Sequence, residues 1–155
     1  MIDVHKAIIY KIAHAYSGGR KDDKEDLIQE IVTQLWLCFH KYDETYKLTT
    51  WIYRIALNVS ISFYRKEGRR HRINQALPAE IIHLQQPAYQ EERQAEIEQL
   101  YTFIRELKEI DRAVILLYLE EHSQQDIADI LGLSVSNVST KVFRIKQQLK
   151  QKFSV

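Results

Sequence analysis

The sequence contains few of the residues that break helices or cross-link chains: four glycines, two prolines and one cysteine among 155 residues. A lone cysteine excludes an intramolecular disulfide, and the six histidines lack ligand spacing, so we expect no metal and no cofactor. Apolar residues recur at intervals of three and four without a hairpin signal, which predicts an all-α fold. Cys38 lies on an apolar helix face, and we expect it to be a small core residue.

The sequence also lacks an apolar run of membrane-spanning length, a signal peptide and a lipidation motif. We therefore expect a cytoplasmic protein with no membrane insertion. It contains no Gly-rich phosphate loop, no metal-spaced ligands and no nucleophile with an accompanying base, which argues against an enzyme. The expected activity is binding.

Acidic residues are absent from residue 134 onward, although the whole chain has 22 basic and 21 acidic residues. The basic residues of this segment are Lys141, Arg144, Lys146, Lys150 and Lys152. A local excess of this kind on a nearly neutral chain makes DNA the first partner to consider.

The residues around this basic segment have the pattern of a helix-turn-helix. A helical apolar stripe over 127–131 ends at Gly132, which can adopt the left-handed conformation, and Ser134 is a good N-cap for the next helix. The buried face of that helix is predicted to comprise Val138, Val142, Ile145 and Leu149. Its opposite face is polar near the start and basic further on, as a recognition helix requires. The candidate DNA-contacting residues are Ser136, Asn137, Thr140, Lys141 and Arg144.

The remaining pattern predicts two small helical domains joined by a flexible linker. In the first domain, residues 1–73, we expect helices over 2–16, from Asp22 or Asp23 to about 40, and over 50–66. Asp22 or Asp23 would cap the second helix in a capping box, Thr49 or Thr50 would cap the third, and 41–48 would form a loop. Residues 74–88 contain both prolines and form the predicted linker. The second domain, residues 89–155, holds a helix to about 108, a short helix after Asp111 and the helix-turn-helix.

The predicted third helix carries a second group of basic residues. The buried face of this helix is predicted to contain Ile52, Ile55, Ala56, Val59 and Phe63, and its polar stripe contains Arg54, Asn58, Ser62 and Arg65. Aromatic residues flank this stripe, and basic residues continue to Arg72. Cations combined with aromatic rings suit unpaired DNA, because rings stack on bases while cations hold the backbone. We expect Trp51 to be a partly buried packing residue, and the pattern leaves Tyr53 open between packing and stacking.

Two segments resemble parts of a known family. The runs DLIQEIVTQLW (26–36) and TTWIYRIALNVSISFYRK (49–66) resemble region 2 of bacterial sigma factors of the sigma-70 family, and residues 107–151 are similar to region 4. A chain with these two modules alone resembles the extracytoplasmic-function group. The chain departs from the family pattern at Leu57, where arginine is frequent, and at Ser139, where a basic residue is frequent.

The resemblance implies a factor that binds core RNA polymerase, through its β′ coiled coil and β flap, and directs initiation at promoters. It implies polymerase contacts for Asp26, Gln29, Glu30 and Gln34. Contacts with the melted −10 element are implied for Tyr42, Leu48, Trp51, Arg54, Asn58, Ser62, Arg65 and Lys66, and recognition of the duplex −35 element for the helix-turn-helix residues named above. Anti-sigma factors commonly hold members of the group, so such a protein is a further expected partner.

One alternative is a helix-turn-helix repressor or activator that acts as a dimer. It predicts a two-fold dimer and a palindromic binding site. The separate basic, aromatic-flanked stripe in residues 51–66 argues against it, because a dimerisation module has no need of such a stripe.

Overall fold

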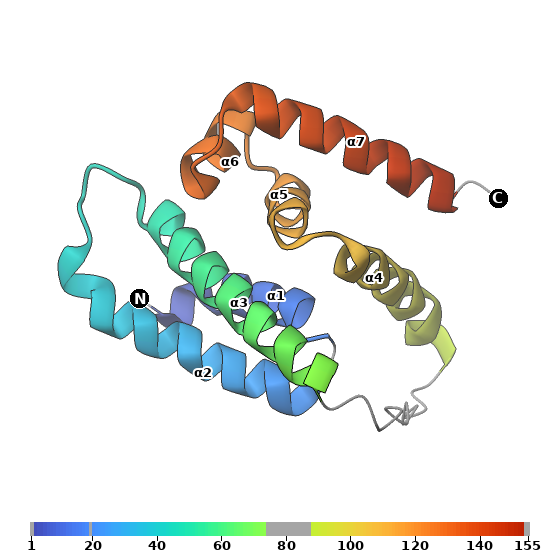
Figure 1. Ribbon diagram of the computed structural model, residues 1–155, viewed down its shortest axis with the longest axis horizontal. Helices are drawn as coiled ribbons and strands as arrows, with labels where there is room; N and C mark the ends of the chain where they lie inside the picture. The colour runs from blue at the N-terminus through green and yellow to red at the C-terminus, as the bar shows by residue number, and fades with distance from the viewer. Residues whose placement is uncertain (1, 19, 74–87, 154–155) are drawn as a thin grey trace.

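A computed structural model describes residues 2–18, 20–73 and 88–153, and within these ranges every regular element is helical (Figure 1). The elements are η1 (Ile2–His5), α1 (Lys6–Tyr16), α2 (Lys21–Cys38), η2 (Phe39–Lys41), α3 (Leu48–Ile73), α4 (Ala88–Glu106), α5 (Glu109–Leu119), α6 (Gln124–Leu131) and α7 (Val135–Phe153). The all-α prediction is confirmed. The predicted linker, 74–88, lies outside the described residues apart from Ala88, the first residue of α4.

The first three long helices form an N-terminal module in which α3 runs back along α2 and both contact α1 (Figure 1). Their buried side chains follow helical spacing, as in Ile9 and Ile12 of α1 and Leu27, Ile31 and Leu35 of α2. Burial of such amphipathic faces supplies most of the stability of short helices, so these helices form without strong caps.

The C-terminal module consists of α4 to α7, with α5 contacting α4, α6 and α7. Val114 and Leu117 of α5, Ile127 of α6 and Val138 and Ile145 of α7 are almost fully buried. This core fixes the angle between α6 and α7, and so the position of the outer face of α7.

The two modules pack against each other, and α3 lies between them: it contacts α1 and α2 on one side and α5 and α6 on the other. The predicted buried face of α3 is therefore partly wrong. Tyr53, Leu57 and Ile61 are buried, whereas Ile55, Val59 and Phe63 are half-buried. A single-face reading missed this because the second face is covered by a segment distant in sequence.

Several predicted helix starts are also wrong. The N-cap of α2 is Arg20, with no side-chain cap, and Asp22 and Asp23 lie inside the first turn, where carboxylates favour the helix dipole. Helix α3 begins at Leu48, so neither Thr49 nor Thr50 is its N-cap. It runs to Ile73 and so passes through Gly68, because one glycine costs a helix only about 1 kcal/mol.

The short helix expected after Asp111 begins earlier, at Glu109. Cys38, expected in the core, is only partly buried at the end of α2.

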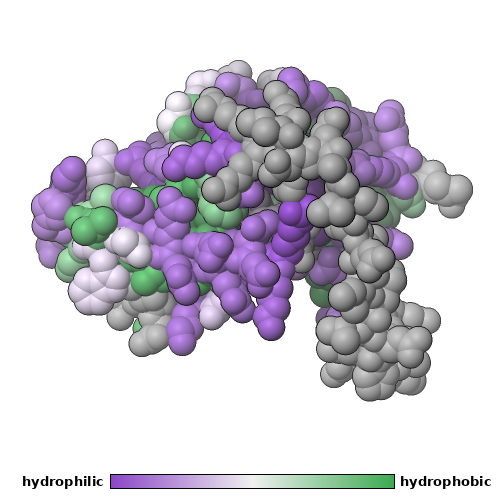
Figure 2. Space-filling model, turned by 60° about the horizontal axis from the view of Figure 1, so that its bottom comes forward, coloured by the Kyte–Doolittle hydropathy of each residue, from purple (hydrophilic) through white to green (hydrophobic). Residues whose placement is uncertain are grey.

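Hydrophilic side chains predominate on the face shown in Figure 2, and apolar side chains are visible between them mainly in its left half.

Candidate nucleic-acid interface

The helix-turn-helix forms as the sequence predicts. Gly132 ends α6 with a φ of +69°, the left-handed conformation, and Ser123 and Ser134 cap the two helices. The Ser134 hydroxyl accepts a hydrogen bond from the backbone N–H of Asn137 at 3.1 Å. Val138, Val142 and Ile145 face the core, so the opposite face of α7 points to solvent.

The outer face of α7 divides into a free part and a tethered part. Ser136, Asn137 and Thr140, near the helix start, are exposed. Lys141 and Arg144 instead donate to the carboxylate of Asp111 in α5, at 2.8 and 2.9 Å. The Asp111 side chain is largely buried, while that of Arg144 is about half exposed, so one carboxylate fixes the direction of two cations. Such tethering reduces the side-chain entropy that would be lost on binding phosphates.

The outer face also contains Phe143, which the sequence analysis missed. Its side chain is 66% exposed, although large apolar residues usually avoid water. It follows Thr140 by three residues and therefore lies on the same face of α7. The sequence contained the signal, because the predicted buried positions 138, 142, 145 and 149 leave position 143 outside the apolar stripe.

The polar stripe of α3 is in part engaged by the other module. The guanidinium of Arg54 donates to the backbone carbonyl of Asp129 in α6, with its Nε at 3.2 Å, and Arg65 Nε donates to the Glu109 carboxylate of α5 at 3.4 Å. Asn58 and Ser62, between these arginines, are exposed, as is Lys66. The predicted stripe therefore exists, with both arginines directed at protein acceptors.

Aromatic rings cluster at the start of the stripe. Trp51, Tyr42 and Phe39 have ring centroids between 5.4 and 6.3 Å apart. Trp51 is half-buried, as expected, and Leu48, one helical turn earlier, is also half-buried. The Tyr42 hydroxyl donates to the carbonyl of Tyr46, which closes the loop between η2 and α3.

The same loop is held by a second local bond. The backbone N–H of Thr45 donates to the Asp43 carboxylate at 3.0 Å, and this bond lowers the pKa of Asp43. Arg54 lies over the Tyr46 ring at 5.1 Å. The loop is thus organised around the N-terminal end of the polar stripe of α3.

Tyr53, which the sequence left open, is a packing residue. It is 6% exposed, and its ring meets that of His122 edge to face with centroids 4.9 Å apart. Burial raises its pKa to about 12, since the phenolate would have to lose its hydration.

The residues expected to bind polymerase share one face of α2. Asp26, Gln29 and Glu30 are exposed and Gln34 is partly exposed. Two residues that the sequence analysis did not assign to this face, Trp36 and Leu37, are 71% and 61% exposed. Helical spacing places Leu37 next to Glu30 and Gln34. Exposed apolar side chains rimmed by polar ones mark a protein-binding surface.

No group of three or more His, Cys, Asp or Glu side chains in the described part of the chain is arranged to hold a metal ion. Among the same residues, no helix combines the length and the apolar character needed to cross a bilayer.

Comparisons with known proteins agree with this division into modules. The Sigma-70 region 2 family matches residues 1–70, and the Sigma-70, region 4 family matches residues 97–149. The chain is 31% identical to the ECF RNA polymerase sigma factor SigM of Bacillus subtilis, over 81% of this chain and 77% of the relative. It is 26% identical to SigW of the same organism, over 97% of this chain and 86% of the relative.

Solved structures share the fold. The sigma factor RpoE from Bartonella quintana, in complex with the anti-sigma factor NepR, superposes with a TM-score of 0.77 at 20% identity, covering 99% of this chain and 94% of the other. CnrH, in complex with the cytosolic domain of CnrY, gives a TM-score of 0.70 at 20% identity, covering 99% and 84%.

Proposed function

The chain belongs to the extracytoplasmic-function group of RNA polymerase sigma factors, and we propose how its surfaces divide the work of such a factor. Sigma factors bind core RNA polymerase and direct initiation at specific promoters, and as a class they are not enzymes. The observation that carries the assignment is that region 2 and region 4 follow each other on one chain. The dimeric repressor has no matching observation.

The first proposed surface is the exposed face of α2, which binds core polymerase. Asp26 and Glu30 supply negative charge for a basic partner, and Gln29 and Gln34 supply hydrogen bonds. Leu37, exposed at the centre of this face, supplies apolar contact area. Mixed apolar and polar composition of this kind is typical of interfaces between proteins.

The second proposed surface holds the unpaired −10 strand. It comprises the loop from Tyr42 to Leu48, Trp51, and the α3 residues Arg54, Asn58, Ser62, Arg65 and Lys66. Unstacking a base costs a few kcal/mol, and stacking against a ring together with cation contacts offsets that cost. The ring cluster at the start of α3 and the exposed amide and hydroxyl groups along it support this assignment.

The third proposed surface is the outer face of α7, which reads the duplex −35 element. Ser136, Asn137 and Thr140 reach base edges, and Lys141 and Arg144 contact phosphates or bases from the positions set by Asp111. Phe143 contacts the C5-methyl group of a thymine, the apolar feature of the major groove.

We further propose that the factor performs no covalent chemistry of its own, acts in the cytoplasm together with core polymerase, and is held by an anti-sigma factor. The anti-sigma proposal is supported by the fold shared with RpoE, whose solved structure contains the anti-sigma factor NepR.

The deciding experiment adds the purified chain to core polymerase and maps start sites on genomic DNA fragments. We expect initiation at defined start sites that core polymerase alone does not use. Core polymerase binding without defined starts would contradict the promoter-recognition role.

A further inference from the structure

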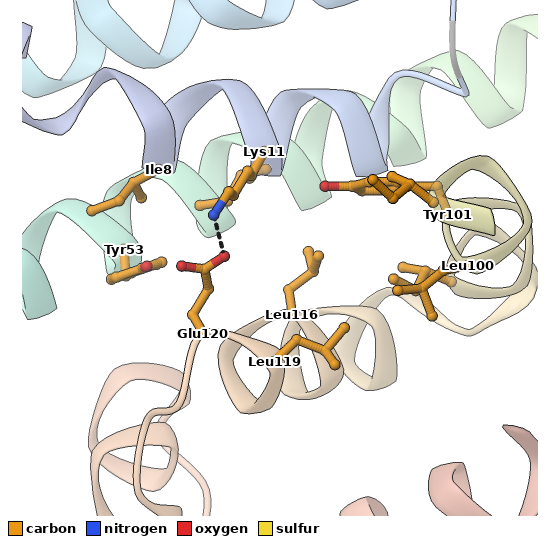
Figure 3. A pocket seen from close by; sticks show the side chains of 11 residues that line it. Ile8, Lys11, Tyr53, Leu100, Tyr101, Leu116, Leu119 and Glu120 are labelled. Carbon is orange, nitrogen blue, oxygen red and sulfur yellow. Dashed lines mark hydrogen bonds and ion pairs between the residues drawn. The ribbon is translucent and has the colours of Figure 1, made fainter. Parts of the chain in front are cut away.

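A cavity of about 220 Å³ lies where α1 meets α4 and α5 (Figure 3). Most of its wall is apolar and comes from Ile8, Ile12, Leu100, Ile104 and Leu116. Protein cores are packed without voids of this size. The cavity therefore has room for a ligand whose apolar part contacts these side chains.

The cavity can be reached from solvent. Ile97 of α4 and Leu119 of α5 line it and are 48% and 43% exposed. An α-helix with its side chains is about 10 Å across, so a cavity of about 220 Å³ is too small to admit one. The occupant that fits is a small molecule or the tip of a single side chain.

One end of the cavity is polar. Lys11 Nζ and the Glu120 carboxylate lie 2.6 Å apart there, and the hydroxyls of Tyr53 and Tyr101 lie near this pair (Figure 3). Among the residues that the structure describes, neither hydroxyl has a hydrogen-bond partner, although neither is sealed from solvent. A ligand at this end would find two unused donors as well as an ion pair.

The two tyrosine hydroxyls are neutral donors. Burial, together with the negative charge of Glu120, raises the pKa of Tyr53 to about 12. Burial also raises the pKa of Tyr101, which the charge of Lys11 lowers and that of Glu120 raises. Both phenols therefore keep their protons at neutral pH, and both lie close enough to the ion pair to be influenced by it.

The ion pair disfavours charged ligands. Lys11 and Glu120 neutralise each other, so a carboxylate in the cavity would lie beside Glu120, and an ammonium group would lie beside Lys11. A neutral hydroxyl group suits both partners, because it donates to a carboxylate and accepts from an ammonium group or a phenol. The apolar walls favour a ring on the rest of the ligand, since an apolar cavity of about 150 Å³ takes up benzene.

We propose that this cavity binds a small neutral phenol, with its ring against the apolar walls and its hydroxyl group between Lys11 and Glu120. The hydroxyls of Tyr53 and Tyr101 supply further donors at the same end. The cavity lies apart from the surfaces assigned above to polymerase and to DNA, and the proposal does not depend on those assignments.

The test titrates 4-methylphenol into the full chain and follows the amide chemical shifts by NMR. We expect one site with a dissociation constant of roughly 0.1–1 mM and shifts centred on α1, α4 and α5. Toluene has the same ring and methyl group without the hydroxyl, and it is expected to bind roughly tenfold more weakly. 4-Methylbenzoate is expected to bind roughly tenfold more weakly as well, since its carboxylate would lie beside Glu120.

Two variants fill the cavity. Leu116→Phe and Leu119→Phe enlarge side chains of its wall, and each is expected to weaken the binding of 4-methylphenol roughly tenfold. Because Leu119 is 43% exposed, Leu119→Phe tests the site independently of any effect of Leu116→Phe on folding. Urea denaturation checks the stability of both variants.

A charge variant tests the polar end. Glu120→Gln leaves Lys11 without its carboxylate, so this variant is expected to bind 4-methylbenzoate roughly fivefold more tightly than the wild type does. The matched control is Glu121→Gln, which removes the same charge from the next residue, outside the cavity lining. It is expected to leave the affinity for 4-methylbenzoate unchanged.

Three results would overturn the proposal. If 4-methylphenol failed to bind, or bound a folded Leu119→Phe variant as tightly as the wild type, the cavity would not be a phenol site and would be left to the side chain of a partner. Toluene binding as tightly as 4-methylphenol would show that the polar end selects no hydroxyl group. Equal gains for 4-methylbenzoate in Glu120→Gln and Glu121→Gln would show that net charge, and not the ion pair, excludes the anion.

Discussion

In α7, Lys141 and Arg144 are held by Asp111 of the same module, whereas in α3, Arg54 and Arg65 are held by acceptors of the other module. Both helices have basic residues, short polar side chains and aromatic residues, although α7 contains one arginine and four lysines whereas α3 contains mainly arginines. They differ in the acceptors that the basic side chains would have to release before they could bind DNA. DNA binding through α7 should therefore be independent of the relative position of the two modules, whereas DNA binding through α3 should depend on it.

This difference also separates two uses of a tether. A carboxylate within the module positions a cation and travels with it to the DNA, so it favours binding by preorganisation. An acceptor on another module competes with the DNA for the same donor. The burial of Asp111 beside α7 and the partial exposure of the Arg65–Glu109 pair fit these two uses.

The largest expected effect is at Arg144. Arg144→Ala should weaken promoter binding roughly 5- to 150-fold, because an arginine at a base or phosphate contributes about 1–3 kcal/mol. Polymerase binding should be unchanged, because the proposed polymerase-binding face lies on α2 of the N-terminal module, and the substitution in α7 does not alter that face. Promoter affinity and core polymerase affinity are measured separately by titration.

The matched control is Arg54→Ala, tested in the free chain on duplex DNA containing the promoter. Because the Arg54 guanidinium donates to the backbone carbonyl of Asp129 in the structure of the free chain, this substitution should leave duplex binding within about twofold of wild type. Equal losses of duplex affinity for Arg54→Ala and Arg144→Ala would contradict the distinction between the two helices. Equal losses of promoter affinity and polymerase affinity for Arg144→Ala would contradict the assignment of Arg144 to DNA.

Phe143 tests the free part of the α7 face with a smaller effect. Phe143→Ala should lower promoter affinity by about 1 kcal/mol through loss of a thymine methyl contact. Replacing the −35 thymines by deoxyuridine removes those methyl groups. Wild type should lose affinity on the deoxyuridine promoter, and Phe143→Ala should bind both promoters alike.

The conservative variant Phe143→Leu should keep part of the preference for thymine. Fold stability should be little affected by either change, because the ring is 66% exposed and outside the core. A Phe143→Ala variant that still distinguishes thymine from deoxyuridine would show that another residue reads the methyl group.

The sequence predicted the parts of the molecule that depend on local spacing. The turn at Gly132, the Ser134 cap and the buried positions of α7 all lie within one continuous segment. The turn, the cap and the burial of Val138, Val142 and Ile145 are confirmed, whereas Leu149 is only partly buried. The family resemblance was carried by two such segments and is confirmed by the comparisons. The roles of individual residues remain predictions.

What the sequence could not supply were contacts between distant segments. Tyr53 and Leu57 are buried because α5 and α6 cover a second face of α3, and no pattern within residues 48–73 specifies that cover. The acceptors of Arg54 and Arg65 lie in the other module for the same reason. The polar residues near helix starts misled the capping predictions, because an aspartate or threonine fits the first turn as well as the cap.

The smallest expected effect concerns the starts of α7 and α3. Ser134→Ala should lower the free energy of unfolding by about 1 kcal/mol, since its hydroxyl accepts from the Asn137 N–H at the start of α7. Thr49→Ala should change it by less than about 0.5 kcal/mol, because Thr49 lies inside α3, which begins at Leu48. Urea denaturation of the full chain measures both, and Ser134→Asn should restore most of the loss. If Thr49→Ala were the more destabilising of the two, Thr49 would be the N-cap, and α3 would begin at residue 50, as predicted from the sequence.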